Sequence, residues 1–135
     1  MKAISTLLKI SQKKLDKLLL DKKTLLTRLE EAQNQLKIAQ NEIKSEVSNY
    51  YNSEYGVFLD KYLKGANLKL DSFQKAIKNY ERQIEILNEE IMEYFAEIKR
   101  YEIIAAKKKK EILLKEQKQE MKNLDELTII KYNNN

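Results

Sequence analysis

The chain has 135 residues and a formal net charge of +5, from 26 Lys and Arg against 21 Asp and Glu. Two glycines and no proline leave too few turn residues for a strand-rich domain, which excludes all-β and α/β folds. Charged residues make up 35% of a sequence dominated by Lys, Glu, Leu, Ile and Gln, which is typical of long helices. We therefore expect one all-α domain spanning residues 1–135.

The residue types also restrict the chemistry. Without cysteine there is no disulfide framework and no thiolate chemistry. Without histidine the chain lacks the commonest metal ligand and the usual general base at neutral pH. A site built from carboxylates alone would need a concave, partly dry pocket, which a narrow helical rod is not expected to offer. We expect no enzymatic activity, cofactor, metal or small-molecule substrate.

The beginning of the chain, MKAISTLLKISQKK, has a short apolar run that Lys9 interrupts. It has no small-residue cleavage site, so we do not expect a signal peptide. No run of 18 consecutive apolar residues occurs anywhere, so no helix is expected to span a membrane. The expected location is cytoplasmic.

A first helix is predicted over about residues 3–51 by apolar residues spaced alternately three and four apart. This 3.5-residue repeat is typical of helices that pair with a left-handed twist. Leu19 and Leu26 lie beside the repeat, where they either cover the partner helix or make an additional protein contact. Only Ser11 and Lys22 interrupt the first repeat, which consists of Ile4, Leu8, Ser11, Leu15, Leu18, Lys22, Leu25, Leu29, Ala32, Leu36, Ala39 and Ile43.

A turn is expected within residues 52–67, which contain both glycines, Gly56 and Gly65. Two positions are compatible with the composition. The turn is centred either near Asn52–Gly56 or at Gly65–Asn67, and the second alternative makes Val57–Leu63 a short helix near the tip. In both cases two long helices with one break predict an antiparallel hairpin.

A second helix is predicted over about residues 68–130, with an uninterrupted repeat that begins in the turn region. Tyr80, Tyr94 and Tyr101 occupy positions of this repeat, so we expect them to pack in the core and not to stack on nucleic-acid bases. The second repeat consists of Leu59, Leu63, Ala66, Leu70, Phe73, Ile77, Tyr80, Ile84, Leu87, Ile91, Tyr94, Ile98, Tyr101 and Ala105.

The two repeats match in length when the turn lies near Asn52–Gly56. Facing residue numbers then add up to about 109, which places Ile4 opposite Ala105. Both regular repeats would end at the same level, an agreement that favours this turn. At 1.5 Å per residue the paired segment would be about 70 Å long.

A basic helical overhang is expected after Ala105, because the next positions of the repeat are mostly polar. Residues 107–122 carry seven lysines and three glutamates, including the four consecutive lysines Lys107–Lys110. Asp125 and Glu126 then reverse the sign of the charge. Residues 131–135 are expected to be a frayed tail.

The overhang suits some partners better than others. Nucleic-acid binding would need a larger basic surface with exposed aromatic residues, whereas glutamates interrupt these lysines. Membrane attachment would need apolar residues on one face, and the adjacent residues Ile112–Leu114 do not share a face. Docking into a protein cavity needs only charged and apolar groups in the cavity that are complementary to those of the helix. A solvated helix end also fits the charge pattern.

The sequence resembles the FliJ/SctO family of bacterial type III export machines. The resemblance lies in the charged helix KEQKQEMKNLDEL (Lys115–Leu127), which leads to Leu124, Asp125 and Glu126. The segment LDKYLKGANLKLDSFQKAIKNYERQIE (Leu59–Glu85) is similar to the family's entry into its second long helix. LLKISQKKLDKL (Leu7–Leu18) fits its N-terminal helix.

The resemblance implies a role as the central stalk of an export ATPase, similar to the γ subunit of rotary ATPases. The terminal end of the hairpin would enter the pore of the hexameric ATPase and promote its assembly or activity. The chain would also contact the membrane-embedded export gate, and some family members bind export chaperones. The residues expected inside the ring are Lys107, Lys108, Lys109, Lys110, Lys115, Lys118, Leu124, Asp125 and Glu126.

The residues leave two further functional classes open. A basic coiled coil that binds nucleic acid or anionic membranes is one, and a structural or chaperone-like coiled coil that self-associates is the other. The resemblance favours the export stalk, which would lie in the cytoplasm at the periphery of the inner-membrane export apparatus. It leaves open whether the system is flagellar or an injectisome.

Overall fold

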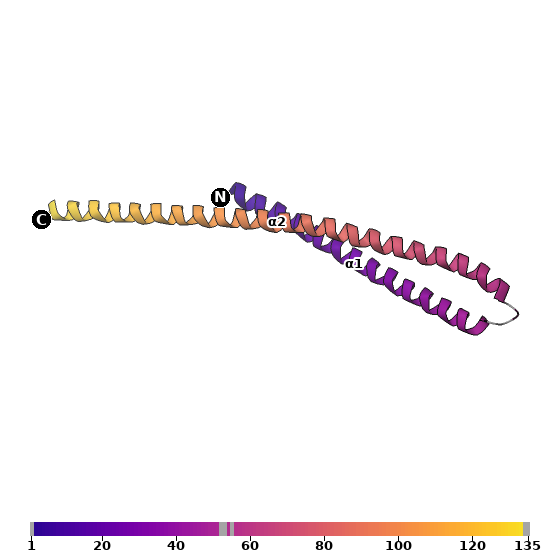
Figure 1. Cartoon of the computed structure of the whole chain (residues 1–135). Helices are drawn as coiled ribbons and strands as arrows, with labels where there is room; N and C mark the ends of the chain where they lie inside the picture. The colour runs from indigo at the N-terminus through magenta and orange to yellow at the C-terminus, as the bar shows by residue number, and fades with distance from the viewer. Residues whose placement is uncertain (1, 52–53, 55, 134–135) are drawn as a thin grey trace. The chain divides into compact units, whose positions relative to one another are not determined.

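The computed structural model describes residues 2–51, 54 and 56–133, and it contains two long helices. Helix α1 spans Lys2–Tyr50 and helix α2 spans Gly56–Asn133 (Figure 1). The two helices pack against each other, and the described residues include no strand. The predicted fold, an all-α antiparallel two-helix hairpin with a helical overhang, is confirmed.

The chain divides into two compact units, each containing parts of both helices. The hairpin unit runs from Asp16 to Met92 and includes the connection between the helices. The terminal unit combines the beginning of α1, through Leu15, with α2 from Glu93 onward.

The core follows both predicted repeats. Every position of the first and second repeats is buried or half-buried, including the polar exceptions Ser11 and Lys22. No described side chain is completely buried, because two helices alone cannot enclose a residue on all sides. The most buried positions are Ile4, Ser11, Leu15, Leu25, Ala32, Ile84, Ile91 and Ile98.

The three tyrosines of the second repeat are half-buried, which confirms their predicted packing role. The hydroxyl of Tyr101 donates a hydrogen bond to Glu97 Oε1 at 2.9 Å, one turn earlier on the same helix. Leu19 and Leu26 lie at the edge of the paired core and are 41% and 45% exposed. These two leucines therefore complete the core only in part.

The boundaries near the turn differ from the sequence prediction. Helix α2 begins at Gly56 and not near residue 68, and Gly65, Ala66 and Asn67 lie inside it. The alternative with a separate short helix and a turn at Gly65–Asn67 is therefore wrong. A glycine costs about 1 kcal/mol inside a helix, and the continued repeat at Leu59, Leu63 and Ala66 offsets this cost.

The end of α1 is closed by a hydrogen bond from the amide of Tyr51 to the carbonyl of Val47, at 3.0 Å. The predicted turn at Asn52–Gly56 falls mostly on residues 52, 53 and 55, which lie outside the described residues. The connection lies between Tyr50, where α1 ends, and Gly56, where α2 begins.

The C-terminal boundary also differs. Residues 131–133, which were expected to fray, are helical. Residues 134 and 135 are not among the residues that the structure describes. Lys131 lies in the last turn of α2, where a positive charge favourably meets the negative end of the helix dipole. Across the described residues neither helix has a stretch that is long and apolar enough to cross a membrane.

The unpaired end of helix α2

The candidate site is the part of α2 that has no helix beside it. In the terminal unit Ala105 is the last half-buried residue, and every residue from 106 to 133 is exposed. Figure 1 shows α2 continuing well past the N-terminal end of α1. We call residues 106–133 the overhang. The predicted end of the packed repeat at Ala105 is confirmed by this change in exposure.

The overhang stays helical because its residues favour that state locally. It contains neither Gly nor Pro and is rich in Lys, Glu, Leu and Gln, which are good helix formers. Opposite charges recur four residues apart, at Lys107 and Glu111 and at Lys122 and Glu126, and this spacing favours an exposed helix although these side chains form no ion pair within the described residues. At 1.5 Å per residue the overhang is about 40 Å long, and a single helix is about 10–12 Å wide with its side chains.

The four lysines Lys107–Lys110 surround the helix. Successive residues of an α-helix are rotated by about 100°, so these side chains leave the axis in four different directions. All four are exposed, and no ion pair involves any of them within the described part of the chain. The lysines therefore form a positively charged collar and not a flat basic patch.

Lys115 and Lys118 lie on one side of the overhang, within about 60° of each other on a helical projection. Glu111, Asp125 and Glu126 fall in the same broad sector, so the sector has both signs of charge. Asp125 and Glu126 are exposed. The residues predicted for the site therefore share one unpaired helix but are not brought together with any other element.

An apolar sector of the overhang was not found from the sequence. Leu113, Leu114, Met121 and Leu124 lie within about 100° of one another on the helical projection. Their exposed fractions range from 48% to 66%. These residues do not continue the repeat that ends at Ala105, so counting that repeat does not reveal them. Plotting the overhang as its own helix would have revealed the sector, which places Leu124 beside three other apolar side chains.

The net charge is concentrated in the terminal unit. This unit has 14 Lys and Arg against 8 Asp and Glu, a balance of +6, over residues 1–15 and 93–135. The hairpin unit, residues 16–92, has 12 basic and 13 acidic residues, a balance of −1. Part of the positive charge comes from residues 1–15 of the chain, which carry four lysines and no acidic residue.

Comparison with known proteins does not assign the site. No family model, curated protein or solved structure matches the chain. The resemblance to the FliJ/SctO family therefore depends on the sequence segments quoted above. Among the described residues, no three His, Cys, Asp or Glu side chains are grouped so that they could hold a metal ion.

Proposed function

We propose that this chain is a non-enzymatic stalk of a bacterial type III export apparatus. The overhang enters the pore of a hexameric export ATPase and promotes the assembly or activity of the ring. The rest of the hairpin links the ring to the export gate in the membrane and offers a surface to export chaperones. The protein acts in the cytoplasm, at the periphery of the inner-membrane apparatus.

The observation that supports this proposal most strongly is the collar of lysines on an unpaired helix. A flat partner, such as a membrane or one side of a nucleic-acid duplex, contacts only one side of a helix. Lys107–Lys110 leave the axis in all directions, so only a partner that surrounds the helix could contact all four lysines. A pore lined with acidic groups has that geometry.

The apolar sector is compatible with the same partner. Leu113, Leu114, Met121 and Leu124 are too exposed to contribute to the fold, yet large apolar side chains gain free energy when a partner covers them. A protein pore can present apolar and acidic groups at different heights. The single helix, about 10–12 Å wide, also needs a narrower opening than a helix pair would.

The proposal is tested with the export ATPase of the same organism, by pull-down and by turnover of ATP. Full-length protein should bind the ATPase and raise its rate, whereas a chain ending at Ala105 should do neither. A variant with Lys107, Lys108, Lys109 and Lys110 all replaced by Gln should bind more weakly, with the deficit largest at low salt.

A matched control removes the same charge elsewhere. Replacing four exposed lysines of the hairpin unit with Gln, at Lys17, Lys23, Lys37 and Lys44, should leave ATPase binding close to that of the unmodified protein. If the full-length protein neither binds the ATPase nor changes its rate, the stalk function should be abandoned.

The other two functional classes predict different measurements. A nucleic-acid or anionic-surface binder would bind DNA, RNA or acidic vesicles tightly, and the affinity would fall steeply as salt rises. A self-associating coiled coil would show a molar mass in light scattering that rises with concentration. The stalk function predicts a monomer without such binding.

A further inference from the structure

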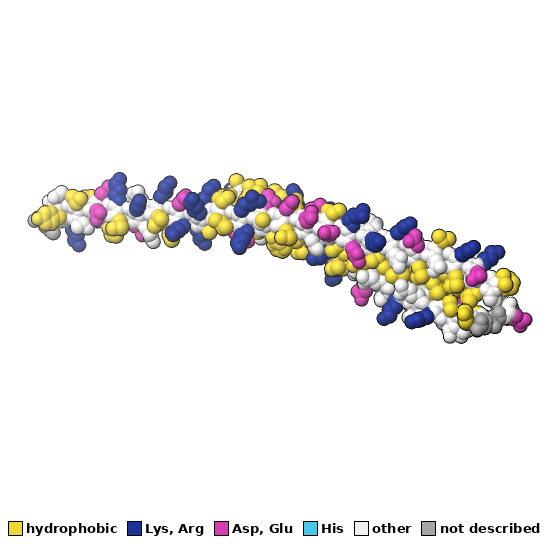
Figure 2. All heavy atoms as spheres, in the orientation of Figure 1, with side chains coloured by type: hydrophobic (Ala, Val, Ile, Leu, Met, Phe, Trp, Pro, Cys, Tyr) yellow, Lys and Arg dark blue, Asp and Glu magenta, His cyan; other side chains and the backbone are white. Residues whose placement is uncertain are grey.

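The hairpin end of the molecule carries a second group of exposed apolar residues, mainly aromatic. Tyr50 is the last residue of α1 and Tyr51 follows it, whereas Val57, Phe58 and Tyr62 come from the beginning of α2. Their exposed fractions range from 41% for Tyr62 to 82% for Val57. Figure 2 shows hydrophobic side chains gathered over this end of the hairpin unit. Exposed apolar groups of this kind often mark a binding surface.

Part of this group lines an open groove between the two helices. The groove has a volume of about 530 Å³ and is lined by Glu46, Tyr50, Phe58, Leu59 and Tyr62. We call it the tip groove. The groove is open to solvent on one side, so it suits side chains of a protein partner better than an enclosed small molecule.

Glu46 gives the tip groove its electrostatic character. Among the described residues that line the groove it is the only charged one, and it is half-buried. No hydrogen bond or ion pair to Glu46 occurs within the described residues. Its neighbours one turn away on α1 are Glu42 and Tyr50, neither of which supplies a positive charge. Within the described part of the chain no cation is paired with this carboxylate, which lines the groove together with three aromatic side chains.

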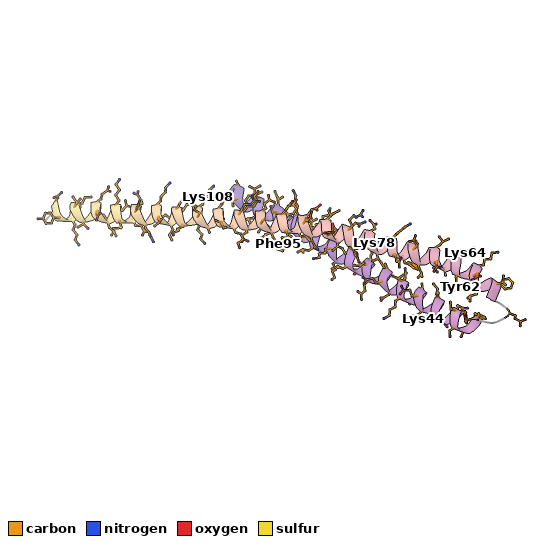
Figure 3. The ribbon with its side chains drawn as sticks, in the orientation of Figure 1. Lys44, Tyr62, Lys64, Lys78, Phe95 and Lys108 are labelled. Atoms are coloured by element: carbon orange, nitrogen blue, oxygen red, sulfur yellow. The ribbon has the colours of Figure 1, made fainter. Side chains whose placement is uncertain are left out.

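A second groove continues from the first one. It has a volume of about 430 Å³, and Tyr62 lines both grooves. Figure 3 labels Tyr62 near the beginning of α2. Gly65 has no side chain to fill the second groove, and a Cβ added there would meet no atom within 4 Å. Its remaining lining includes Lys61 and Lys69 on α2 and Glu42 on α1. A bound segment can therefore extend past Tyr62 along the hairpin unit.

We propose that the tip groove binds a protein segment that presents an Arg or Lys beside a bulky apolar residue. The cation meets the carboxylate of Glu46 and lies over the aromatic rings, where cations are attracted by the face of the ring. Arginine fits best, because its planar guanidinium pairs with a carboxylate and stacks on an aromatic ring at once. The apolar neighbour packs against Phe58 and Leu59.

The same charge argues against a phosphate-bearing partner. Glu46 lines the groove, so a phosphate bound there would meet a carboxylate. The tip groove belongs entirely to the hairpin unit, and its proposed role does not depend on what the overhang enters.

A library of short random peptides displayed on phage, selected against the full-length protein, tests this inference. We expect the enriched peptides to share an Arg or Lys next to Leu, Ile, Phe or Met. One enriched peptide is then synthesised and titrated against the protein. Replacing its Arg with citrulline, which has a similar shape but no charge, should weaken binding roughly tenfold.

Variants of the protein locate the site. Glu46→Gln and Phe58→Ala should each weaken peptide binding, whereas Glu30→Gln, at an exposed position of α1, should leave it unchanged. Phe58 is 69% exposed, so its replacement should leave the helix content measured by circular dichroism unchanged. An acidic or purely apolar consensus, the absence of a consensus, or full binding by Glu46→Gln would overturn the inference.

The overhang provides an independent control. The variant with Lys107–Lys110 replaced by Gln should bind the selected peptide as the unmodified protein does. Loss of peptide binding in that variant would mean that the peptide contacts the overhang, and the assignment to the tip groove would be wrong. Failure to bind the export ATPase would leave the result at the tip groove unaffected.

Discussion

Helix α2 contains two parts that differ in what covers them. From Leu59 to Ala105 an apolar or aromatic side chain lies against α1 at every three to four residues. From residue 106 to 133 the helix continues without interruption, yet every side chain is exposed. Both parts are rich in Lys, Glu, Leu and Ile. Their composition therefore does not decide which part packs; the spacing of the apolar residues does.

The two parts also contribute differently to the molecule. The paired part stabilises the hairpin by burying Ile84, Ile91 and Ile98 against α1. The overhang adds length and charge but no burial, so it is free to bind a partner without weakening the fold. This separation predicts that stability and binding can be changed independently, and the following substitutions test it.

The largest expected effect comes from removing a core side chain. Ile91 is 6% exposed, so Ile91→Ala should lower the free energy of unfolding by about 2–4 kcal/mol. Leu124 is 62% exposed, so Leu124→Ala should change it by less than about 0.5 kcal/mol. Urea denaturation followed by circular dichroism measures both. Equal destabilisation by the two substitutions would show that the overhang is packed in solution.

A smaller effect is expected from the glycine inside α2. A Cβ at Gly65 meets no atom within 4 Å, so Gly65→Ala should raise the free energy of unfolding by about 1 kcal/mol through helix propensity alone. Gly56→Ala, at the first residue of the helix, should have a smaller effect. Thermal unfolding compares the two variants. A destabilising Gly65→Ala would mean that α2 is not a regular helix at this position.

The polar residue in the core of the terminal unit gives a similar or slightly smaller effect. Ser11 is 5% exposed at a position where the repeat otherwise has apolar side chains. Ser11→Ala should stabilise the protein by about 0.5–1 kcal/mol, because alanine favours the helix and removes a hydroxyl from the core. Ser72→Ala, at an exposed position of α2, measures the contribution of propensity alone. Identical gains would show that burial of Ser11 is unimportant.

The smallest expected effect is a pH dependence at the end of the paired part. The hydrogen bond to Glu97, followed by burial and the negative charge of Glu97, raises the pKa of Tyr101 above its usual value of 10.0, although Arg100 lowers it in part. Because the pKa is higher in the folded state, Tyr101 stabilises the fold fully below pH 10. This contribution is lost as the pH rises through the raised pKa.

Comparing the unmodified protein with Tyr101→Phe isolates this contribution, since the other tyrosines titrate in both. The stability difference between the two proteins should shrink as the pH rises beyond 10, and urea denaturation at several pH values measures it. Glu97→Gln should bring the tyrosinate absorbance of Tyr101 to a lower pH. An unchanged difference across this range would show that the Tyr101–Glu97 hydrogen bond is absent in solution.

The sequence predicted the core well because each helix carries its own periodic pattern. The alternation of three and four residues from Ile4 to Ile43, and from Leu59 to Ala105, can be counted without knowing the partner. The position of Gly65 was misleading, since glycine favours turns in general but is tolerated in a helix whose packing continues on both sides. The beginning of α2 was therefore predicted near residue 68, about twelve residues too late.

The candidate sites were harder to predict from the sequence than the core. Lys107–Lys110 stand out in any reading of the sequence, but their arrangement around the axis follows only if the helix continues unbroken beyond Ala105. The tip groove combines Glu46 and Tyr50 from α1 with Phe58 and Tyr62 from α2. The groove forms where these two helix ends lie side by side, and this arrangement depends on the position of the turn. The sequence was compatible with two turn positions, so it did not predict the groove.

The unbroken overhang has a geometric consequence for any partner that holds its far end. Between Ala105 and Asn133 the helix contains no glycine or proline at which it could bend easily. Each inserted residue would move the distal end outward by about 1.5 Å and turn it by about 100°. Seven inserted residues would thus lengthen the overhang by about 10 Å while returning the apolar sector nearly to its original direction. Two inserted residues would add little length but turn that sector to nearly the opposite side.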